Sequence, residues 1–239
     1  MTFFVRVYVY FCYTKNNISM KDFEKFARSE RNVNPMTLHD YTVAMDGMIG
    51  TSIVEERKLN VAVMDVFSRL MMDRIIFLGV PIDNDVANII QAQMLYLASV
   101  KPTADISLYL NTPGGEVSSG FGIYDTMQLI QPDVSTICTG MAASMGSVIL
   151  CSGAKGKRCI LPHAKVMIHQ PLGGAKGQAS DILIAAKEIE RTRQEICDIM
   201  SHHTGKTSEQ LFFDMDRDFW MTAGEAVEYG MADKILTKK

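Results

Sequence analysis

Short apolar runs recur through the middle of the chain and predict buried β-strands. They extend from Ile106 to Leu110, from Val134 to Cys138 and from Val166 to His169. Uninterrupted runs of this length are typical of strands that are covered on both faces of a parallel sheet. Each of the first two is followed by a segment long enough for a helix, so the pattern predicts an α/β fold of stacked right-handed β–α crossover units.

Three other segments have the features of helices. Val86 to Ala98 follows the acidic and amide residues 83–85, which favour a helix start, and Ser180 to His203 has the longest apolar stripe of helical period. Thr222 to Glu225 matches a capping box, and Gly230 provides a stop for the short helix that this box begins. A long helix and a short helix are therefore predicted after the last buried strand.

The first 47 residues differ in character from the rest of the chain. Phe3 to Tyr13 is aromatic and apolar, but it is too short to span a bilayer and lacks the basic lead-in and cleavage site of a signal peptide. Lys21 to Arg31 is charged and is compatible with a short surface helix. Met20, Met36 and Met48 are all plausible beginnings for the functional chain.

The composition is that of a soluble globular enzyme. The 239 residues are 47% hydrophobic and 21% charged, which suits one sizeable domain with an appendage. A net charge of −3 without a long basic run argues against nucleic acid as the main partner, and no apolar run is long enough to cross a membrane. The five cysteines are odd in number and several lie in apolar segments, so we interpret them as free thiols in a reducing, cytoplasmic compartment.

One hydroxyl lies in a run of small residues, Thr139 to Ser147, where the predicted strand from Val134 turns into a helix. Ser144 would have the free N–H groups and the positive dipole end of that helix nearby, and both favour a developing anion. The small residues around it would let another polypeptide approach closely. A serine that only caps a core helix fits this segment equally well.

Two further segments favour a catalytic role for Ser144 over a role as a helix cap. The strand that ends in His169 and the charged turn that contains Asp218 would supply a base and an orienting carboxylate, which acyl transfer by a serine requires. Taken alone, His169 is more typical of a structural histidine and Asp218 of a solvated carboxylate, and the spacing does not prove that they meet at Ser144. The glycine-rich turn from Asn111 to Gly115 could bring backbone N–H groups to a substrate, although it also suits an ordinary strand-to-helix turn.

Two other motifs carry little weight. Gly205-Lys206-Thr207 looks like the end of a phosphate-binding loop, but Met200 stands where that loop needs its first glycine, and a helix precedes it instead of a strand. His202 and His203 are adjacent and cannot both face one metal ion from a helix. We therefore predict no metal site and no cofactor in this chain.

Beyond these patterns, the chain resembles the ClpP family, the proteolytic subunits of ATP-dependent Clp proteases, from about Ile49 to Leu236. Five co-linear motifs carry the resemblance. Ser144 and His169 are 25 positions apart, and His169 and Asp218 are 49 positions apart, which also fits the family. The motifs are Phe67–Leu70 with Ile75–Gly79, Leu108–Gly115, Gly140–Gly146, Met167–Pro171 and Glu225–Gly230.

The resemblance implies a fold of the ClpP/crotonase type with a protruding strand–helix handle at about residues 170–203. It implies Ser144 as nucleophile, His169 as general base and Asp218 as orienting acid, so that peptide bonds in unfolded chains are hydrolysed through an acyl-enzyme on Ser144. The oxyanion-hole donors would be the backbone N–H groups of Gly115 and Met145.

The resemblance also implies a division of the chain. Residues 1–47 would be an N-terminal extension or propeptide that the enzyme removes, with the mature start near Met48. Residues 48–66 would form the axial loop and N-terminal segment, and residues 67–239 would form the serine peptidase domain.

Partners follow from the same resemblance. Two stacked seven-membered rings would form a tetradecamer, and a AAA+ unfoldase of the ClpX or ClpA/ClpC type would use ATP to deliver chains for protein degradation and quality control. Asp216 and Arg217 match the pair with which family members sense ring stacking, although a solvated surface ion pair explains them equally well. The unfoldase-docking pocket would combine four apolar residues with three that are smaller or more polar: Tyr109, Leu129, Ile137 and Leu161, then Ser107, Thr139 and Cys159.

Other functions on the same scaffold are the alternatives. A crotonase-like acyl-CoA enzyme would use the glycine-rich turns and an acid such as Glu116, but it would leave Ser144, His169 and Asp218 unexplained. A serine–lysine peptidase is disfavoured because His169 stands at the expected interval, and a catalytically idle ring subunit is disfavoured because the set of three is complete.

Overall fold

A computed structural model describes residues 60–238, the segment 52–57 and, nearer the N-terminus, residues 25, 26, 29, 34–36, 38 and 39. Most of the predicted 1–47 extension lies outside these residues, as do Met20, Met48, the apolar segment from Phe3 to Tyr13 and most of the charged segment from Lys21 to Arg31.

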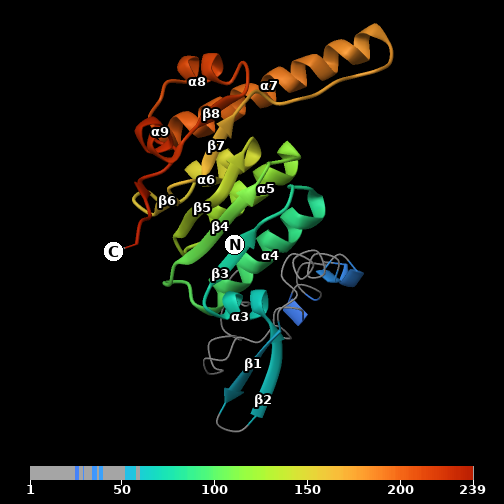
Figure 1. The fold of residues 1–239 in the computed structure, drawn as a ribbon. Helices are drawn as coiled ribbons and strands as arrows, with labels where there is room; N and C mark the ends of the chain where they lie inside the picture. Colours follow the sequence, from blue (N-terminus) through green and yellow to red (C-terminus); the bar gives the residue numbers. More distant parts are fainter. Residues whose placement is uncertain are drawn as a thin grey trace.

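A twisted sheet forms the centre of the molecule and confirms the predicted α/β class (Figure 1). Its main path has the strand order β3-β4-β5-β6-β9, and β7 and β8 extend it from the second half of β5. All neighbours are parallel except β7 and β8. The strands are β3 Ile75–Leu78, β4 Ile106–Thr112, β5 Val134–Ala143, β6 Arg158–Ile160, β7 Lys165–Ile168, β8 Phe219–Met221 and β9 Lys234–Ile235.

The long strand β5 pairs with two different strands along the same edge. Its first half pairs with β6 through Thr136 to Cys138, and its second half pairs with β7 through Met141 to Ala143. The sequence predicted only the first half of β5, because the glycine and alanine residues of its second half have low strand propensity. Pairing with β7 extends the strand as far as the residue before Ser144.

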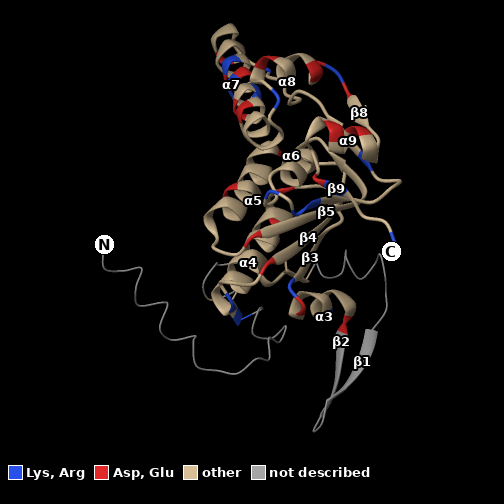
Figure 2. Ribbon diagram, turned by 90° about the vertical axis from the view of Figure 1, so that its left-hand side faces the viewer, with Lys and Arg blue, Asp and Glu red and all other residues tan. Residues whose placement is uncertain are grey.

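The helices α4, α5 and α6 cover one face of the sheet (Figure 2). That face buries alternate residues of β4, namely Ile106, Leu108 and Leu110, as a strand with a period of two requires. The predicted helix at Val86 to Ala98 is confirmed as α4, which Asp83 caps and which extends two residues further at each end. The predicted capping box of Thr222 and Glu225 and the stop at Gly230 are confirmed for α9. The helices are α3 Val66–Met72, α4 Asn84–Val100, α5 Val117–Leu129, α6 Met145–Cys151, α7 Ala179–Thr204, α8 Ser208–Asp214 and α9 Ala223–Tyr229.

Two segments extend from this body. Strands β1 (Ser52–Arg57) and β2 (Asn60–Asp65) pair as an antiparallel hairpin, in the region where an axial loop was predicted (Figure 1). Helix α7 projects from the opposite end and carries charged residues along much of its length (Figure 2). Within the described part of the chain, no helix combines the length and apolar character needed to cross a membrane.

The strand expected before α7 is absent from this single chain. Residues 171–176 have no regular secondary structure, and a Cβ atom at Gly174 would meet nothing within 4 Å, although one at Gly173 would meet the side chain of Ile189 on α7. A strand requires a neighbour whose backbone groups pair with its own, and the described chain offers none to this segment. The helical half of the predicted handle is confirmed, whereas its strand half is not formed within one subunit.

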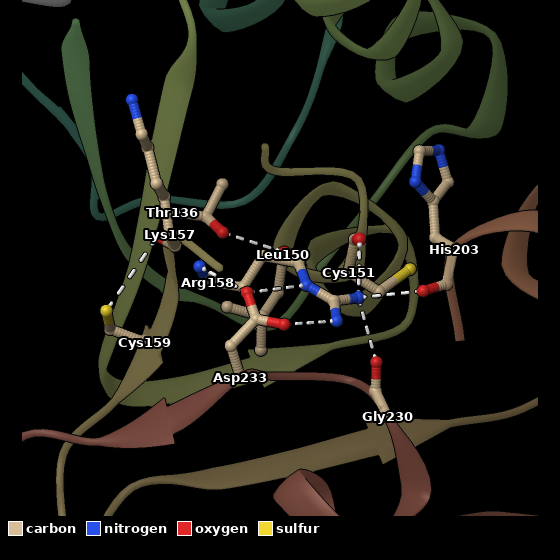
Figure 3. Close-up of polar contacts among 9 residues, drawn as sticks. All are labelled: Thr136, Leu150, Cys151, Lys157, Arg158, Cys159, His203, Gly230 and Asp233. Carbon is tan, nitrogen blue, oxygen red and sulfur yellow. Dashed lines mark hydrogen bonds and ion pairs between the residues drawn. The ribbon is translucent and has the colours of Figure 1, made fainter. Parts of the chain in front are cut away.

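A buried arginine ties the C-terminal elements together (Figure 3). The Arg158 side chain is only 8% exposed, and its Nη2 lies 2.6 Å from Oδ1 of Asp233. Its Nη1 donates to the carbonyl oxygens of Cys151, His203 and Gly230, which lie in the last turns or caps of α6, α7 and α9. A cation is favoured at a helix C-terminus because the last carbonyl groups lack partners, so one guanidinium joins three helix ends to Asp233, the residue before β9.

The imidazole of His203 is half-buried beside this cluster. Its ring lies 5.8 Å from that of Tyr124, and its Nε2 has no hydrogen-bond partner within the described structure. Burial, together with the neighbouring His202 and Arg158, lowers the pKa of His203 from 6.5 to about 4. The folded protein therefore keeps this side chain neutral in mildly acidic solution.

The low pKa of His203 predicts a loss of stability in acid. Between about pH 6.5 and 4 the unfolded chain binds a proton at His203 that the folded chain does not, so lowering the pH through this window favours unfolding. The melting temperature of both proteins should fall as the pH is lowered through this range. We expect the total fall to be about 3 °C smaller for His203→Gln than for the wild type. Circular dichroism melts at several pH values measure this.

The exposed His163 provides the control. His163→Gln should retain the wild-type dependence of melting temperature on pH. Parallel curves for the wild type and His203→Gln would show that His203 contributes nothing to acid stability.

Candidate active site

Ser144 occupies a sharp turn between β5 and α6. Its φ of 52° and ψ of −127° lie in a region that residues other than glycine rarely adopt. Such a conformation costs of order 1–3 kcal/mol and persists only where the surroundings enforce it. Here the Ser144 N–H donates to the carbonyl oxygen of Met167 at 2.9 Å, and the Ser144 carbonyl accepts from the Ser147 hydroxyl at 2.6 Å. The turn resembles a nucleophile elbow, which holds a serine hydroxyl away from the backbone.

His169 follows directly after the strand that pairs with β5. Ala143 is in register with Met167, so the ends of the two parallel strands lie side by side. The Nε2 atom of His169 lies 2.9 Å from Oγ of Ser144, a normal hydrogen-bond distance. The imidazole is mostly buried, which limits the orientations that it can adopt.

Asp218 reaches the other nitrogen of the same ring. Its Oδ1 lies 2.9 Å from Nδ1 of His169. The sequence predicted a loop position for Asp218 but missed strand β8, which begins at the next residue and pairs antiparallel with β7, opposite Ile168. The apolar run after the charged turn, Phe219 to Met221, was the available signal for that strand. The structure thus brings all three predicted side chains into one hydrogen-bonded chain.

The glycine-rich turn packs directly against the Ser144 turn. A Cβ atom at Gly114 would lie 2.5 Å from the Ala143 carbonyl oxygen and 2.7 Å from Cβ of Ser144. A Cβ atom at Gly115 would lie 2.1 Å from the carbonyl oxygen of Ile82. Both residues also have positive φ, so only glycine allows this approach.

The two predicted oxyanion donors are available for a ligand. The N–H of Met145 is at the first position of α6, where helix geometry provides no acceptor. The N–H of Gly115 lies between two backbone bonds that join residues 114 and 116 to Ile82. Neither group donates a hydrogen bond within the described part of the chain.

A small apolar cavity of about 10 Å³ lies beside Ser144 and His169, and sequence reasoning did not find it. Its walls come from α5, α6, α7 and the segments next to β7 and α8, which are far apart in the chain. The apolar lining residues are Val117, Met145, Val148, Pro171, Ile196, Met200 and Met215.

The residues predicted to sense ring stacking are exposed and only loosely paired. Asp216 and Arg217 approach each other at 4.0 Å, and Arg217 is almost fully exposed. Asp216 also lies 3.9 Å from Nη2 of Arg193, a residue on α7 that the sequence did not single out. In one subunit, Asp216 therefore has contacts with two cations.

Some of the predicted docking residues form one row across the sheet. Tyr109 stacks on Phe77 with ring centroids 5.1 Å apart, and it is in register with Ile137, which is in register with Cys159. Leu161 follows β6 and packs against the core. Leu129 is exposed at the end of α5, a separate element, so the structure of one subunit does not bring it into this row.

Comparison with known proteins gives a consistent match. The family model described as "Clp protease" matches residues 57–239. A protein of Porphyromonas gingivalis is 62% identical over 219 residues, 92% of this chain and 99% of that protein. Proteins of Bacteroides fragilis and Bacteroides thetaiotaomicron are 58% and 56% identical over 220 residues, 92% of this chain and all of each protein. All three are named "ATP-dependent Clp protease proteolytic subunit".

The contact between Gly114 and Ser144 predicts that a single methyl group will disable the site. In Gly114→Ala, the added Cβ must displace the backbone at Ala143 and Met145, so the Ser144 hydroxyl and the nearby N–H groups move apart. We expect Ser144 to react with a fluorophosphonate probe at least about 100-fold more slowly, since displacements of about 1 Å cost that much. Gel fluorescence over time measures the labelling rate.

Gly224→Ala is the matched control, because a Cβ atom at Gly224 meets nothing within 4 Å. This variant should label at the wild-type rate. Wild-type labelling of Gly114→Ala would contradict the proposed tight packing.

Proposed function

The chain belongs to the Clp protease family, and we propose that Ser144, His169 and Asp218 perform its serine peptidase chemistry. The observation that carries the proposal is the bridging position of His169. One of its ring nitrogens lies 2.9 Å from the Ser144 hydroxyl and the other lies 2.9 Å from the Asp218 carboxylate. A base that is held by an acid and contacts a hydroxyl is the arrangement that activates a serine.

In the first half of the reaction, Ser144 attacks the carbonyl carbon of a peptide bond. His169 accepts the hydroxyl proton at Nε2, while its Nδ1–H donates to Oδ1 of Asp218. Asp218 thereby fixes the tautomer and stabilises the imidazolium that forms. The imidazolium then gives its proton to the leaving amine, and the acyl group stays on Ser144.

The developing oxyanion is stabilised by the N–H groups of Gly115 and Met145. Two observations support this role. Neither N–H group donates a hydrogen bond within the described part of the chain, and the glycine turn packs closely on the Ser144 turn. A preorganised donor of this kind contributes about 100- to 1,000-fold in rate. Water, activated by His169 in the same manner, then hydrolyses the acyl-enzyme.

The apolar lining of the small cavity favours substrates with an apolar side chain next to the cleaved bond, for which the cavity must widen when the substrate binds. Two methionines, Met200 and Met215, contribute flexible walls that adapt to side chains of different shape. We therefore propose a broad preference for apolar residues, as suits an enzyme that degrades many unfolded chains.

The alternatives fit the site less well. A serine–lysine peptidase needs a lysine amine at the serine hydroxyl, whereas the group within 2.9 Å of Ser144 Oγ is His169. In a crotonase-like acyl-CoA enzyme, Glu116 would act on the substrate. The Glu116 carboxylate instead accepts hydrogen bonds from Ser118 and Ser119 at the start of α5, which keep it ionised and occupied.

We further propose that the active form is a pair of stacked seven-membered rings supplied by an ATP-dependent AAA+ unfoldase. Support comes from apolar side chains on and before α7 that one subunit leaves exposed, Leu172, Leu183 and Ile184, which a second ring would cover. The proposed unfoldase-docking surface contains Tyr109, Leu129, Ile137 and Leu161, and Asp216 and Arg217 are the proposed ring sensors. The four described cysteines carry no disulfide, which suits a reducing cytoplasm.

The chain division is also a proposal. Residues 1–47 would be removed, residues 48–66 would form the axial segment, and residues 67–239 would form the peptidase domain. Support comes from the family match, which begins at residue 57, and from the hairpin of β1 and β2, which projects away from the body as a pore loop would.

Removing the Ser144 hydroxyl tests the chemistry. Ser144→Ala should lower hydrolysis of an apolar fluorogenic peptide by about 10⁶-fold, to the residual level that binding and oxyanion stabilisation provide. Assembly should be retained, because only one oxygen is lost from a turn that backbone bonds hold. Peptide turnover and size-exclusion chromatography measure the two outcomes. Turnover within tenfold of the wild type would reject Ser144 as the nucleophile.

The same variant tests the proposed trimming. If Ser144 removes the extension, the purified wild-type subunit should begin near Met48, with about 192 residues, while Ser144→Ala keeps a longer N-terminus. Intact mass spectrometry compares them. Equal full-length masses with an active wild type would show that activity needs no trimming, and equal short masses would assign the cleavage to another protease or to an internal start.

A further inference from the structure

The carboxylate of Asp218 has little direct support. Its side chain is 62% exposed, and within the described residues its one hydrogen bond is to Nδ1 of His169. An orienting acid must nevertheless stay at a fixed position relative to the imidazole. Strand β8, which begins at the next residue and pairs with β7, holds Asp218 from its C-terminal side. On the N-terminal side its position depends on the last turn of α8 and the turn that follows, residues 212–218, which we call the acid loop.

One side of the acid loop is held by the residue after His169. The Gln170 N–H donates to the carbonyl oxygen of Met215 at 2.6 Å, and its Nε2 donates to that of Asp216 at 2.8 Å. These bonds fix the loop to the end of β7. They do not restrain its start, where α8 passes into the turn.

Arg193 holds the other side. This residue lies on α7, and its side chain is only 11% exposed. Its Nη2 donates to the carbonyl oxygen of Phe212 at 2.9 Å, and its guanidinium lies 3.4 Å from the centroid of the Phe212 ring. The same nitrogen lies 3.9 Å from Oδ1 of Asp216. Every one of these contacts is made with the acid loop.

The burial of Arg193 is costly, which indicates a specific role. Its Nε is buried and has no hydrogen-bond partner within the described structure, and leaving a buried donor unpaired costs about 1–3 kcal/mol. A lysine could keep the charge, but it could not stack on the ring and donate to the carbonyl with the same planar geometry.

We propose that Arg193 is a positioning residue, which fixes the acid loop from α7 and so aims Asp218 at His169. This inference rests on the proposed peptidase function. Because Ile196, one turn further along α7, lines the apolar pocket, the same helix sets both the substrate wall and the position of the acid.

A double-mutant cycle on purified full-length enzyme tests the proposal. Arg193→Ala should lower kcat for a fluorogenic peptide by about 10- to 100-fold and leave KM within about twofold, because the acid is misplaced while the substrate pocket stays intact. Arg193→Lys should fall between Arg193→Ala and the wild type. When Asp218 is already replaced by Asn, adding Arg193→Ala should cost less than about twofold more, because residues that act through one another are not additive.

Arg191→Ala is the matched control. Arg191 is 72% exposed on the same helix and pairs only loosely with Glu195, so this variant should keep the wild-type kcat. Phe212→Leu, which removes only the stacked ring, should reproduce part of the kcat loss and provides a milder variant if Arg193→Ala does not fold.

Three results would overturn the inference. They are an unchanged kcat in Arg193→Ala, a rise in KM alone, or an equal loss in the wild-type and Asp218→Asn backgrounds, which would indicate a general structural role. Peptide hydrolysis that survives in Ser144→Ala would instead reject the proposed function, whatever the Arg193 variants do.

Discussion

The parallel pairing of β5 with β7 is the constraint on which the site depends. Both strands run in the same direction and end at the same edge, and the bond from the Ser144 N–H to the Met167 carbonyl continues their ladder by one residue. That bond holds the backbone of Ser144 beside the end of β7, and the register places Ser144 level with Ile168, the residue before His169. Parallel sheets gather chemically useful side chains at the carboxyl ends of their strands for this reason. The remaining parts of the site are arranged around this one junction.

Much of the fold follows from local patterns. Buried strands, the caps of α4 and α9 and the long helix α7 are all encoded within short windows, and the sequence predicted them. The three residues of the hydrogen-bonded chain were candidates from their residue types, but the family resemblance was needed to predict that they act together. The φ of Ser144, strand β8 and the arginine contacts were missed, because each depends on residues that are far apart in the chain. The strand before α7 was implied by the family resemblance, and it is not formed in one subunit because pairing depends on a partner strand.

The site combines rigid and adjustable parts. Ser144 and the glycine turn are locked by backbone contacts in which no extra carbon fits, so their geometry changes little without unfolding. Asp218 is exposed and depends on a loop held from two different elements. The hydroxyl and the base are therefore fixed by the sheet, whereas the acid lies between β8, which belongs to the sheet, and a turn that contacts α7. A shift of α7 would alter the acid while leaving the elbow unchanged.

The Arg158 cluster restricts the substitutions that this chain can accept during evolution. A buried ion pair that loses one member leaves a charge without compensation, at a cost of about 3–5 kcal/mol. Arg158 and Asp233 are 75 positions apart, and three further carbonyl groups depend on the same guanidinium. Replacement of either residue is therefore tolerated only together with a change at the other, or after other substitutions have raised the stability of the subunit. The same restriction applies to the short tail beyond α9, which must extend at least as far as Asp233. A chain that ended before Asp233 would leave the charge of Arg158 unpaired where three helices end.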